Sequence, residues 1–388
     1  MVSSVTVAGI TSTGSKRPEA LFGGDYDGPV LRMARSAGAT VWDEEGKEYL
    51  DFMMALGAVA LGYADPAVNQ AVIDAVARGA VGSLPPVEEA ALASELGEVL
   101  TGLEEVRFLK TGAEAVAAAV RLARAHTSRD EVLGCGYHGW LDWCSKGAGV
   151  PPDSAALYSE LPFNDPERCT AMIRAAGDRL ACVVIEPVVD RAPSAEWLRV
   201  LREETRRSGA VLIFDEIKTA FRVGMGGAAS RWGGEPDLVV LGKALANGFP
   251  LAAVGGRSEV MQKVRDTWIS STLATEFVSF AAARATIRVA RDRGLPGYLE
   301  RIGAPFMEGL HRLAGDYPGL VSEVRGIPQM CYLQWVSDDV SGRVARECAR
   351  RGLLFKRNAY NFVSLAHHRE DIERALGTLE AVLRDLSC

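Results

Sequence analysis

The sequence predicts an α/β protein whose mostly parallel sheet is covered by helices on both faces, followed by a smaller α+β domain. Short apolar runs alternate with longer helical patterns between residues 106 and 241. Strands that are apolar throughout are typical of parallel sheets buried on both faces. After about residue 290 this alternation stops. The runs expected to be strands of the sheet are 106–109, 131–133, 182–185, 211–214 and 238–241.

The N-terminal part is expected to form an arm and a hairpin that belong to the smaller domain. Residues 41–43 and 49–51 are β-rich, and the polar stretch 44–47 lies between them. A short polar segment with a glycine between two such runs indicates a hairpin. We therefore assign residues 1–60 to this arm and hairpin.

Helical spacing dominates the next part of the chain, from residue 66 to about 103 and again at 114–126 and 196–208. Because strands and helices in alternation build a parallel sheet, we assign residues 61–290 to one large domain. Ligands of such sheets bind at the carboxyl ends of the strands. Functional residues are therefore expected there.

The C-terminal part, residues 291–388, is expected to complete the smaller domain. Two β-rich runs, 331–335 and 362–365, follow helical stretches. Apolar residues from Ile372 to Leu383 recur at helical spacing and indicate a last helix.

The composition is that of an ordinary globular enzyme. The 388 residues carry a net charge of −7, and no block of Lys or Arg is long enough for a nucleic-acid groove. No signal peptide is expected in the first 20 residues, and the longest nearly apolar run is too short to span a bilayer. The seven scattered cysteines predict neither a disulfide framework nor a metal site and fit a reducing cytoplasm. The pair His367-His368 is interpreted as a solvated turn.

Charged residues follow three of the expected strands directly. Glu186, Asp215 and Lys243 each come at the end of an apolar run. Taken singly, such a residue often marks only the point where a strand reaches water. Taken together, the three side chains suit pyridoxal phosphate (PLP), which needs a lysine to hold it as a Schiff base and an acid on its ring nitrogen. Lys243 and Asp215 fit these two roles.

A phosphate needs backbone donors, and the segment 111–115 opens an alanine-rich helix after an expected strand. A helix N-terminus offers free N–H groups, and Gly112 lets the backbone approach an anion closely. The same pattern also suits an ordinary strand-to-helix turn. Tyr137 is a candidate to stack on the cofactor ring, although alone it is interpreted as a core aromatic, and so is His138.

In order and spacing these pieces resemble the class III aminotransferases of PLP fold type I, and most closely the branch similar to glutamate-1-semialdehyde aminomutase. The resemblance implies a large domain with a mostly parallel seven-stranded sheet and a small α+β domain. The segments that carry it are VWDEEGKEYLDF, KTGAEAVAAAVRLARA, GYHGW, VVIEPV, LIFDEIKTAFR, LGKALANGFPLAAVGG, STLATEFVSFAAA and NFVSLAH.

The resemblance implies a role for each matching residue of the ring site. Lys243 would hold PLP as a Schiff base, and Asp215 would pair with the pyridine nitrogen. Ile217 would pack on one face of the ring and Tyr137 would stack on the other. Glu186 would support the site from the neighbouring strand end.

It also implies a homodimer with the active site at the interface. Gly112 and Ala113 would donate backbone N–H groups to the phosphate. Thr272 would reach the phosphate of the neighbouring subunit. Pyridoxamine phosphate would be the alternate form of the cofactor.

Some residues depart from the family's pattern and argue against glutamate semialdehyde as the substrate. Ala113 stands where the family often has Ser or Thr, so a side-chain hydroxyl group that could bind the phosphate is missing. The semialdehyde enzyme binds the substrate carboxylate with a Ser/Arg pair, for which Ser15 and Arg17 are the nearest candidates here. The other departures are Lys218, Ala220 and Thr275, with Leu56 and Ala359 at positions where the semialdehyde enzyme has Trp and Glu.

Three segments, GSKRPEALF, GYHGW and NFVSLAH, resemble more closely the members that act on amino sugars or aminocyclitols. A substrate rich in hydroxyl groups would suit an entrance lined by polar side chains. The candidates, besides Arg17, are Glu276, Tyr360, Asn361 and Ser364.

The leading interpretation is transamination, in which Lys243 moves a proton while an amino group passes from a donor to a ketone or aldehyde in a biosynthetic pathway. The first alternative is an aminomutase or epimerase that uses the same lysine. A nucleotide-binding dehydrogenase would need Gly-x-Gly-x-x-Gly between a strand and a helix, and residues 224–227 do not follow a clear strand. A cofactor-free binding protein would not need both Lys243 and Asp215.

Overall fold

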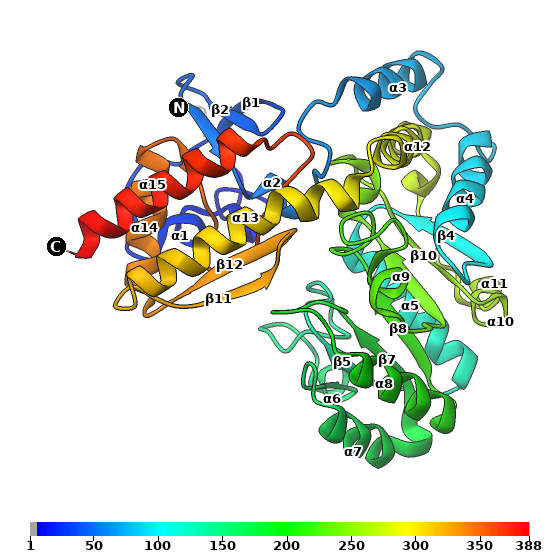
Figure 1. Cartoon of the computed structure of the whole chain (residues 1–388). Coiled ribbons are helices and arrows are strands. Elements are labelled where there is room, and N and C mark those ends of the chain that lie inside the picture. The colour runs from blue at the N-terminus through cyan, green and yellow to red at the C-terminus, as the bar shows by residue number, and fades with distance from the viewer. Residues whose placement is uncertain (1–5, 388) are drawn as a thin grey trace, which may run out of the picture. The chain divides into compact units, whose positions relative to one another are not determined.

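The computed structural model describes residues 6–387 (Figure 1). Cys388 lies outside this range, and so do the first five residues of the segment in which no signal peptide was expected. The chain divides into two compact units. The large unit comprises residues 58–61 and 66–298. The small unit comprises the described residues before 58, residues 62–65 and the chain from 299 onward. The domain limits drawn from sequence stay a prediction, because compactness alone does not show that a unit folds independently.

The large unit contains a seven-stranded sheet in the order β4-β10-β9-β8-β7-β5-β6. Its neighbours are parallel except where β10 pairs, antiparallel, with β4 and β9. The predicted mostly parallel sheet is therefore confirmed. The strands are β4 Glu105–Leu109, β5 Glu131–Cys135, β6 Tyr158–Glu160, β7 Leu180–Ile185, β8 Val211–Asp215, β9 Leu238–Leu241 and β10 Ala252–Gly256.

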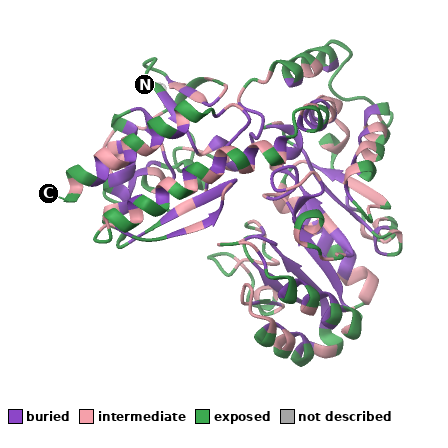
Figure 2. Cartoon of the chain, in the orientation of Figure 1, coloured by how far each residue is buried: buried purple, intermediate pink, exposed green. Residues whose placement is uncertain are grey.

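Helices cover both faces of this sheet, because successive residues of each strand point to opposite sides. Cys182 and Val184 of β7 pack with α5 in one apolar cluster. Val183 and Ile185 pack with α8 in another cluster. The strands are buried and the outer helix faces are exposed (Figure 2). The helices of the large unit are α3 Pro66–Ala77, α4 Val87–Val99, α5 Gly112–Thr127, α6 Pro152–Ala156, α7 Pro166–Ala176, α8 Ala195–Ser208, α9 Gly227–Trp232, α10 Ser258–Met261, α11 Val264–Thr267 and α12 Phe277–Asp292.

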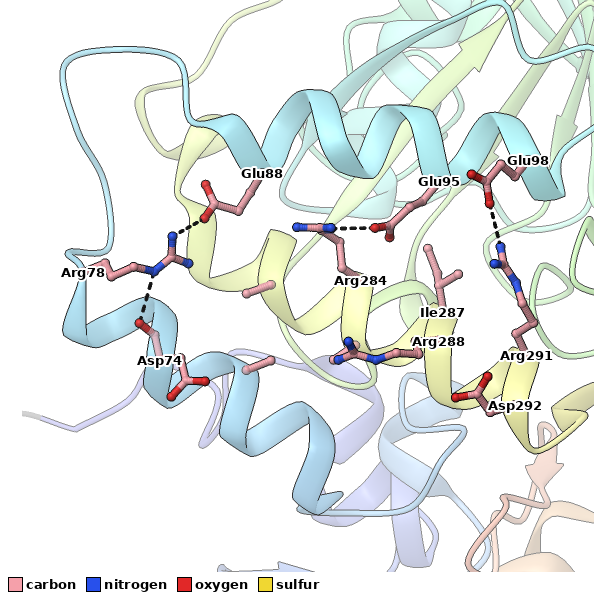
Figure 3. A pocket seen from close by; sticks show the side chains of 13 residues that line it. Asp74, Arg78, Glu88, Glu95, Glu98, Arg284, Ile287, Arg288, Arg291 and Asp292 are labelled. Atoms are coloured by element: carbon pink, nitrogen blue, oxygen red, sulfur yellow. Dashed lines mark hydrogen bonds and ion pairs between the residues drawn. The ribbon is translucent and has the colours of Figure 1, made fainter.

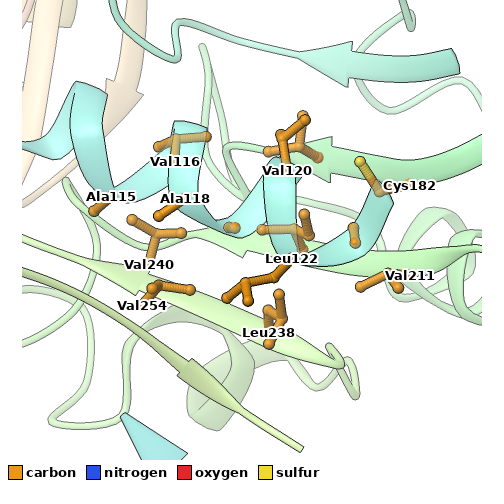
Figure 4. Packing of buried hydrophobic residues seen from close by; sticks show 14 of the residues in the cluster. Ala115, Val116, Ala118, Val120, Leu122, Cys182, Val211, Leu238, Val240 and Val254 are labelled. Carbon is orange, nitrogen blue, oxygen red and sulfur yellow. The ribbon is translucent and has the colours of Figure 1, made fainter. Parts of the chain in front are cut away.

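The N-terminus of α5 is fixed by a capping box. The Thr111 hydroxyl accepts a hydrogen bond from the Glu114 N–H, and the Glu114 carboxylate accepts one from the Thr111 N–H. Such reciprocal bonds satisfy two backbone donors and set where the helix begins. Along the same helix, Val116, Val120 and Leu122 pack over strands of the sheet (Figure 4). The helix is therefore held both at its start and along its inner face.

The small unit contains two further sheets, ordered β1-β2-β3-β13 and β11-β12-β14. The predicted hairpin is confirmed as β2 paired with β3. Of the predicted run 362–365 only Phe362 lies in a strand, and β11, rich in polar residues, was not predicted. The strands are β1 Met33–Ala37, β2 Thr40–Asp43, β3 Glu48–Asp51, β11 Val321–Ile327, β12 Met330–Trp335, β13 Leu353–Leu354 and β14 Asn361–Phe362.

Helices pack around these sheets, and α13, Leu295–Asp316, is shared between the two units of the chain. The other helices of the small unit are α1 Pro18–Phe22, α2 Met54–Gly57, α14 Asp338–Arg350 and α15 Arg369–Ser387. The last of them confirms the predicted C-terminal helix. Among residues 6–387, no helix is both long and apolar enough to cross a membrane.

The interpretation of His367-His368 as a solvated turn is wrong for the first histidine. His367 is fully buried, and its Nδ1 lies 2.9 Å from the Ser364 hydroxyl. Burial lowers the pKa of His367 to about 4. His368, by contrast, is exposed.

The close packing of β10 gives a test of the fold. A methyl group at Gly256 would lie 2.1 Å from the Asp237 carbonyl oxygen, whereas one at Gly97, on the exposed side of α4, would meet nothing. We expect Gly256→Ala to lower the free energy of unfolding by about 2 kcal/mol or more. Gly97→Ala should raise it by about 0.5–1 kcal/mol. Urea unfolding followed by circular dichroism measures both, and equal midpoints for Gly256→Ala and the parent would contradict the close pairing of β10 with its neighbours.

Candidate active site

Several of the site residues predicted from the sequence lie at one edge of the large sheet. Because β5, β7, β8 and β9 are mutually parallel, their carboxyl ends lie on the same side. The segments that leave this edge carry Tyr137 and His138 after β5, Glu186 after β7, Asp215 at the end of β8, and Lys243 after β9.

Lys243 is held in an unusual backbone conformation. Its φ is +46°, in the left-handed region, and it directly follows the extended residue Gly242 and opens the 3-10 helix Lys243–Ala246. Strained backbone of this kind is concentrated at functional sites. Burial, and after it the positive charge of Lys218, lower the pKa of the Lys243 amine to about 8, although the charges of Glu186 and Asp215 act in the opposite direction. The amine can therefore lose its proton near neutral pH.

Asp215 is buried, with 2% of its surface exposed, and both of its carboxylate oxygens have partners. Oδ2 lies 2.9 Å from Nδ1 of His138, and Oδ1 accepts a 3.2 Å hydrogen bond from the Ile217 N–H. His138 is itself buried, as expected of a core residue, but its contact with Asp215 was not predicted. The signal available was its place beyond the end of β5, on the edge where Asp215 also lies.

Glu186 is fixed between two donors. Its Oε1 lies 2.9 Å from the Lys218 ammonium, and its Oε2 accepts a 2.9 Å hydrogen bond from the Tyr137 N–H. Gly136 lets the carboxylate approach, since a methyl group there would lie 2.6 Å from Oε2. Tyr137 is 71% exposed, so its interpretation as a core aromatic is wrong, and its stacking on a cofactor stays a prediction.

A cradle of small residues lies at the N-terminus of α5. Gly112 and Ala113 are the first two residues of the helix, so their N–H groups have no helical carbonyl four residues before them. Ile217 packs against this turn, because a methyl group at Gly112 would lie 2.7 Å from its Cδ1. A methyl group at Gly242 would lie 3.5 Å from the same side chain. Ile217 therefore joins the helix start to the segment that carries Lys243.

Glu276 and Thr272 lie on the segment before α12. Glu276 caps that helix by accepting hydrogen bonds from the N–H groups of Val278 and Ser279, and its carboxylate is 2.5 Å from the Lys110 ammonium. This gives Glu276 a structural role at a position where substrate contact was predicted. Thr272, in the 3-10 helix Thr272–Thr275, is exposed.

The other predicted substrate residues belong to the small unit. The Asn361 side chain accepts from the Lys356 N–H at 2.7 Å and donates to the Lys356 carbonyl at 3.1 Å. The Tyr360 ring contacts Phe362. Arg17 is exposed at the start of α1. Their predicted contacts with a substrate stay predictions.

A cavity of about 660 Å³ lies within the small unit. Its lining includes Leu56, Asp51 and Tyr63, and the Tyr63 hydroxyl donates a 2.6 Å hydrogen bond to Asp51. Leu56 and the preceding Ala55 have φ values of +60° and +51°, which L-residues rarely adopt. This strained part of α2 borders the cavity, whose lining is mostly apolar.

A second cavity, of about 500 Å³, lies among α3, α4 and α12 of the large unit and contains none of the predicted site residues. Figure 3 shows arginines facing glutamates across it. Its ion pairs are Arg78–Glu88, Arg284–Glu95 and Arg291–Glu98. Because three of its arginines are paired with glutamates, we interpret this cavity as part of a structural contact between helices.

Comparison with known proteins identifies the family. Residues 23–383 match the model of the class III aminotransferases. The glutamate-1-semialdehyde 2,1-aminomutase of Thermomicrobium roseum is 35% identical, over 96% of this chain and 94% of its own.

Solved structures agree with this match. The PLP internal aldimine form of the FumI protein from Sphingopyxis has a TM-score of 0.89 and 26% identity, over 95% of this chain and 91% of its own. A transaminase with PLP bound has a TM-score of 0.85 and 29% identity, over 93% and 92% of the two chains. The predicted fold type and cofactor are thereby confirmed. The chain belongs to the class III aminotransferases, and it is a PLP-dependent enzyme.

Proposed function

We propose that this enzyme is an aminotransferase that moves an amino group to a ketone or aldehyde of a small polar metabolite, with Lys243 as its working base. The observation that carries the proposal is the convergence of Lys243, Asp215 and the start of α5 at one edge of the sheet. The cofactor follows from family membership, and the three converging groups would bind its aldehyde, its ring nitrogen and its phosphate.

The residues at this edge fit PLP. Lys243 would bind it covalently, and Asp215 would hold its ring nitrogen. The free N–H groups of Gly112 and Ala113, at the positive end of a helix, would hold its phosphate. Ile217 can pack against both segments because Gly112 and Gly242 have no side chains. The Ile217 side chain would then provide an apolar surface for one face of the ring.

PLP, when bound, supplies an electron-withdrawing ring that makes the C–H bond at the amino-bearing carbon of the substrate more acidic. The neutral Lys243 amine would take up that proton at Nζ and, in a transamination, would deliver it to the carbon through which the cofactor had been attached. Asp215, anchored by His138 and the Ile217 N–H, would keep the ring nitrogen protonated. Glu186 and Lys218 form an ion pair whose charges act on the Lys243 amine.

An aminomutase is the second candidate, because a protein with that activity is 35% identical over nearly the whole chain. Both reactions use Lys243 and Asp215 in the same way. Leu56 and Ala359, which replace the Trp and Glu of the semialdehyde enzyme, argue against glutamate semialdehyde as the substrate. A transaminase is also among the similar solved structures.

The acceptor proposed from sequence is an amino-sugar or aminocyclitol precursor of a biosynthetic pathway. Contacts in the structure give this part no added support, because Asn361, Glu276 and Ser364 all bond to neighbours in the protein. The full proposal includes a cytoplasmic homodimer. Two observations are compatible with it, the exposed position of Thr272 and the free thiols of the six described cysteines.

The half-reaction with an amino donor tests transamination. Mixing the PLP enzyme with a panel of donors, beginning with L-glutamate, should convert its absorbance to that of the pyridoxamine form and release one keto acid per site. Asp215→Asn should slow this conversion by about 100-fold or more, because the ring nitrogen loses its anionic partner. Asp153→Asn, at an exposed position, is the control. Isomerisation of an amino aldehyde without keto acid would favour the aminomutase instead.

The buried amine predicts a pH-dependent effect on stability. Folding lowers the pKa of Lys243 from 10.5 to about 8, so between these values the unfolded chain binds the proton more strongly and stability rises with pH. In the cofactor-free protein at pH 7, Lys243→Met should therefore raise the melting temperature by about 2–4 °C. The gain should shrink towards pH 10.

Differential scanning calorimetry of the cofactor-free proteins measures this gain. Lys146→Met, at an exposed lysine, is the matched control and should give no gain. A gain for Lys243→Met that is absent at pH 7, or that grows with pH, would contradict the lowered pKa of the buried amine.

A further inference from the structure

A buried ion pair lies at the same edge of the sheet as the proposed attachment lysine, because Lys243 follows β9, the parallel neighbour of β8. Lys218 Nζ and Glu186 Oε1 are 2.9 Å apart, and their side chains are only 10% and 7% exposed. Glu186 follows the end of β7 directly, and Lys218 is three residues beyond the end of β8. Because β7 and β8 are neighbouring parallel strands, the fold itself brings the two charges together.

The pair is held in place from both sides. The second oxygen of Glu186 accepts from the Tyr137 N–H, and the Glu186 N–H donates to the Cys135 carbonyl at 2.8 Å. On the other side, the Lys218 carbonyl accepts a 3.2 Å hydrogen bond from Arg222 Nε. These bonds fix the Glu186 carboxylate and the backbone at Lys218, and the 2.9 Å ion pair then places the Lys218 ammonium.

Stability alone does not explain such a pair. Removing two charges from water costs about as much as their attraction returns, and apolar residues of similar volume often stabilise a protein equally well. The effect of this pair on Lys243 is specific. Burial has the largest effect on that amine, followed by the charge of Lys218, which disfavours its protonation. The opposing carboxylates are Glu186 and Asp215, and Arg222 acts in the same sense as Lys218.

Taking Lys243 as the attachment point, as in the proposed function, we propose that Lys218 is a positioning residue that favours the uncharged form of the Lys243 amine. Glu186 holds Lys218 in place and moderates its effect. An uncharged amine is the form that can attack an aldehyde and accept a proton, so the pair acts on the reaction through Lys243 and needs no contact with the substrate.

The opposite charges of the pair predict opposite effects, which a purely structural role would not produce. Lys218→Met removes a positive charge and leaves Glu186 unpaired, so Lys243 should hold its proton to higher pH. Glu186→Gln keeps the hydrogen-bonding shape and removes the negative charge that faces Lys218, so Lys243 should lose its proton at lower pH. In the double variant Lys218→Met/Glu186→Gln the two effects should largely cancel.

Competitive acetylation of the cofactor-free protein across pH, analysed peptide by peptide by mass spectrometry, gives the protonation midpoint of Lys243 directly. We expect a rise of about one pH unit or more for Lys218→Met and a fall of similar size for Glu186→Gln. Lys218→Arg, which keeps the charge, should stay close to the parent. Lys110→Met is the matched control, because it breaks another mostly buried Lys–Glu pair whose members are not among the charges that act on Lys243.

Unchanged midpoints in the two single variants, or shifts in the same direction, would overturn the inference. If Lys218→Met does not fold, the direction of the shift in Glu186→Gln decides the matter alone. Failure of the proposed function is recognised separately in the parent protein: PLP would then not attach to Lys243, whatever the midpoints show. Attachment at Lys243 without opposite shifts would reject only the role of Lys218.

Discussion

The parallel alignment of β7, β8 and β9 is the constraint on which the rest of the site depends. It places three strand ends at one edge, and with them the side chains of Glu186, Asp215 and Lys243. The edge is surrounded by apolar clusters on both faces of the sheet, so charges there are only weakly screened by water. The fold thus supplies both the proximity of the charges and the environment in which they influence one another.

Within that environment the carboxylates at the edge are held in place by their own hydrogen bonds and ion pairs. Asp215 is anchored by His138, and Glu186 is anchored by the backbone of Tyr137 and by Lys218. None of these bonds involves Lys243, so they can remain in place while that lysine exchanges partners. Arrangement of fixed charges before the reaction is the general means by which enzymes stabilise charge that develops during it.

The sequence predicted the strands that are strongly apolar. It missed strands that form mainly because neighbouring strands pair with them. The small residues of β10, Ala-Ala-Val-Gly-Gly, form a strand because β4 and β9 lie on either side of it. At the site, motifs identified Lys243 and Asp215 because their chemistry demands a lysine and an acid. The contact of His138 with Asp215 depends on the spatial order of β5, β7 and β8, which periodicity does not reveal. Lys218 was noticed only as a departure, since its partner Glu186 lies 32 residues earlier, after another strand.

Covalent labelling tests the central assignment most directly. Sodium borohydride applied to the PLP-loaded protein converts the link between lysine and cofactor into a stable secondary amine, and peptide mass spectrometry then identifies the modified residue. The account predicts stoichiometric labelling at Lys243 and none at Lys218, although both amines lie at the same edge of the sheet. Labelling of Lys218, or of any lysine other than Lys243, would contradict it.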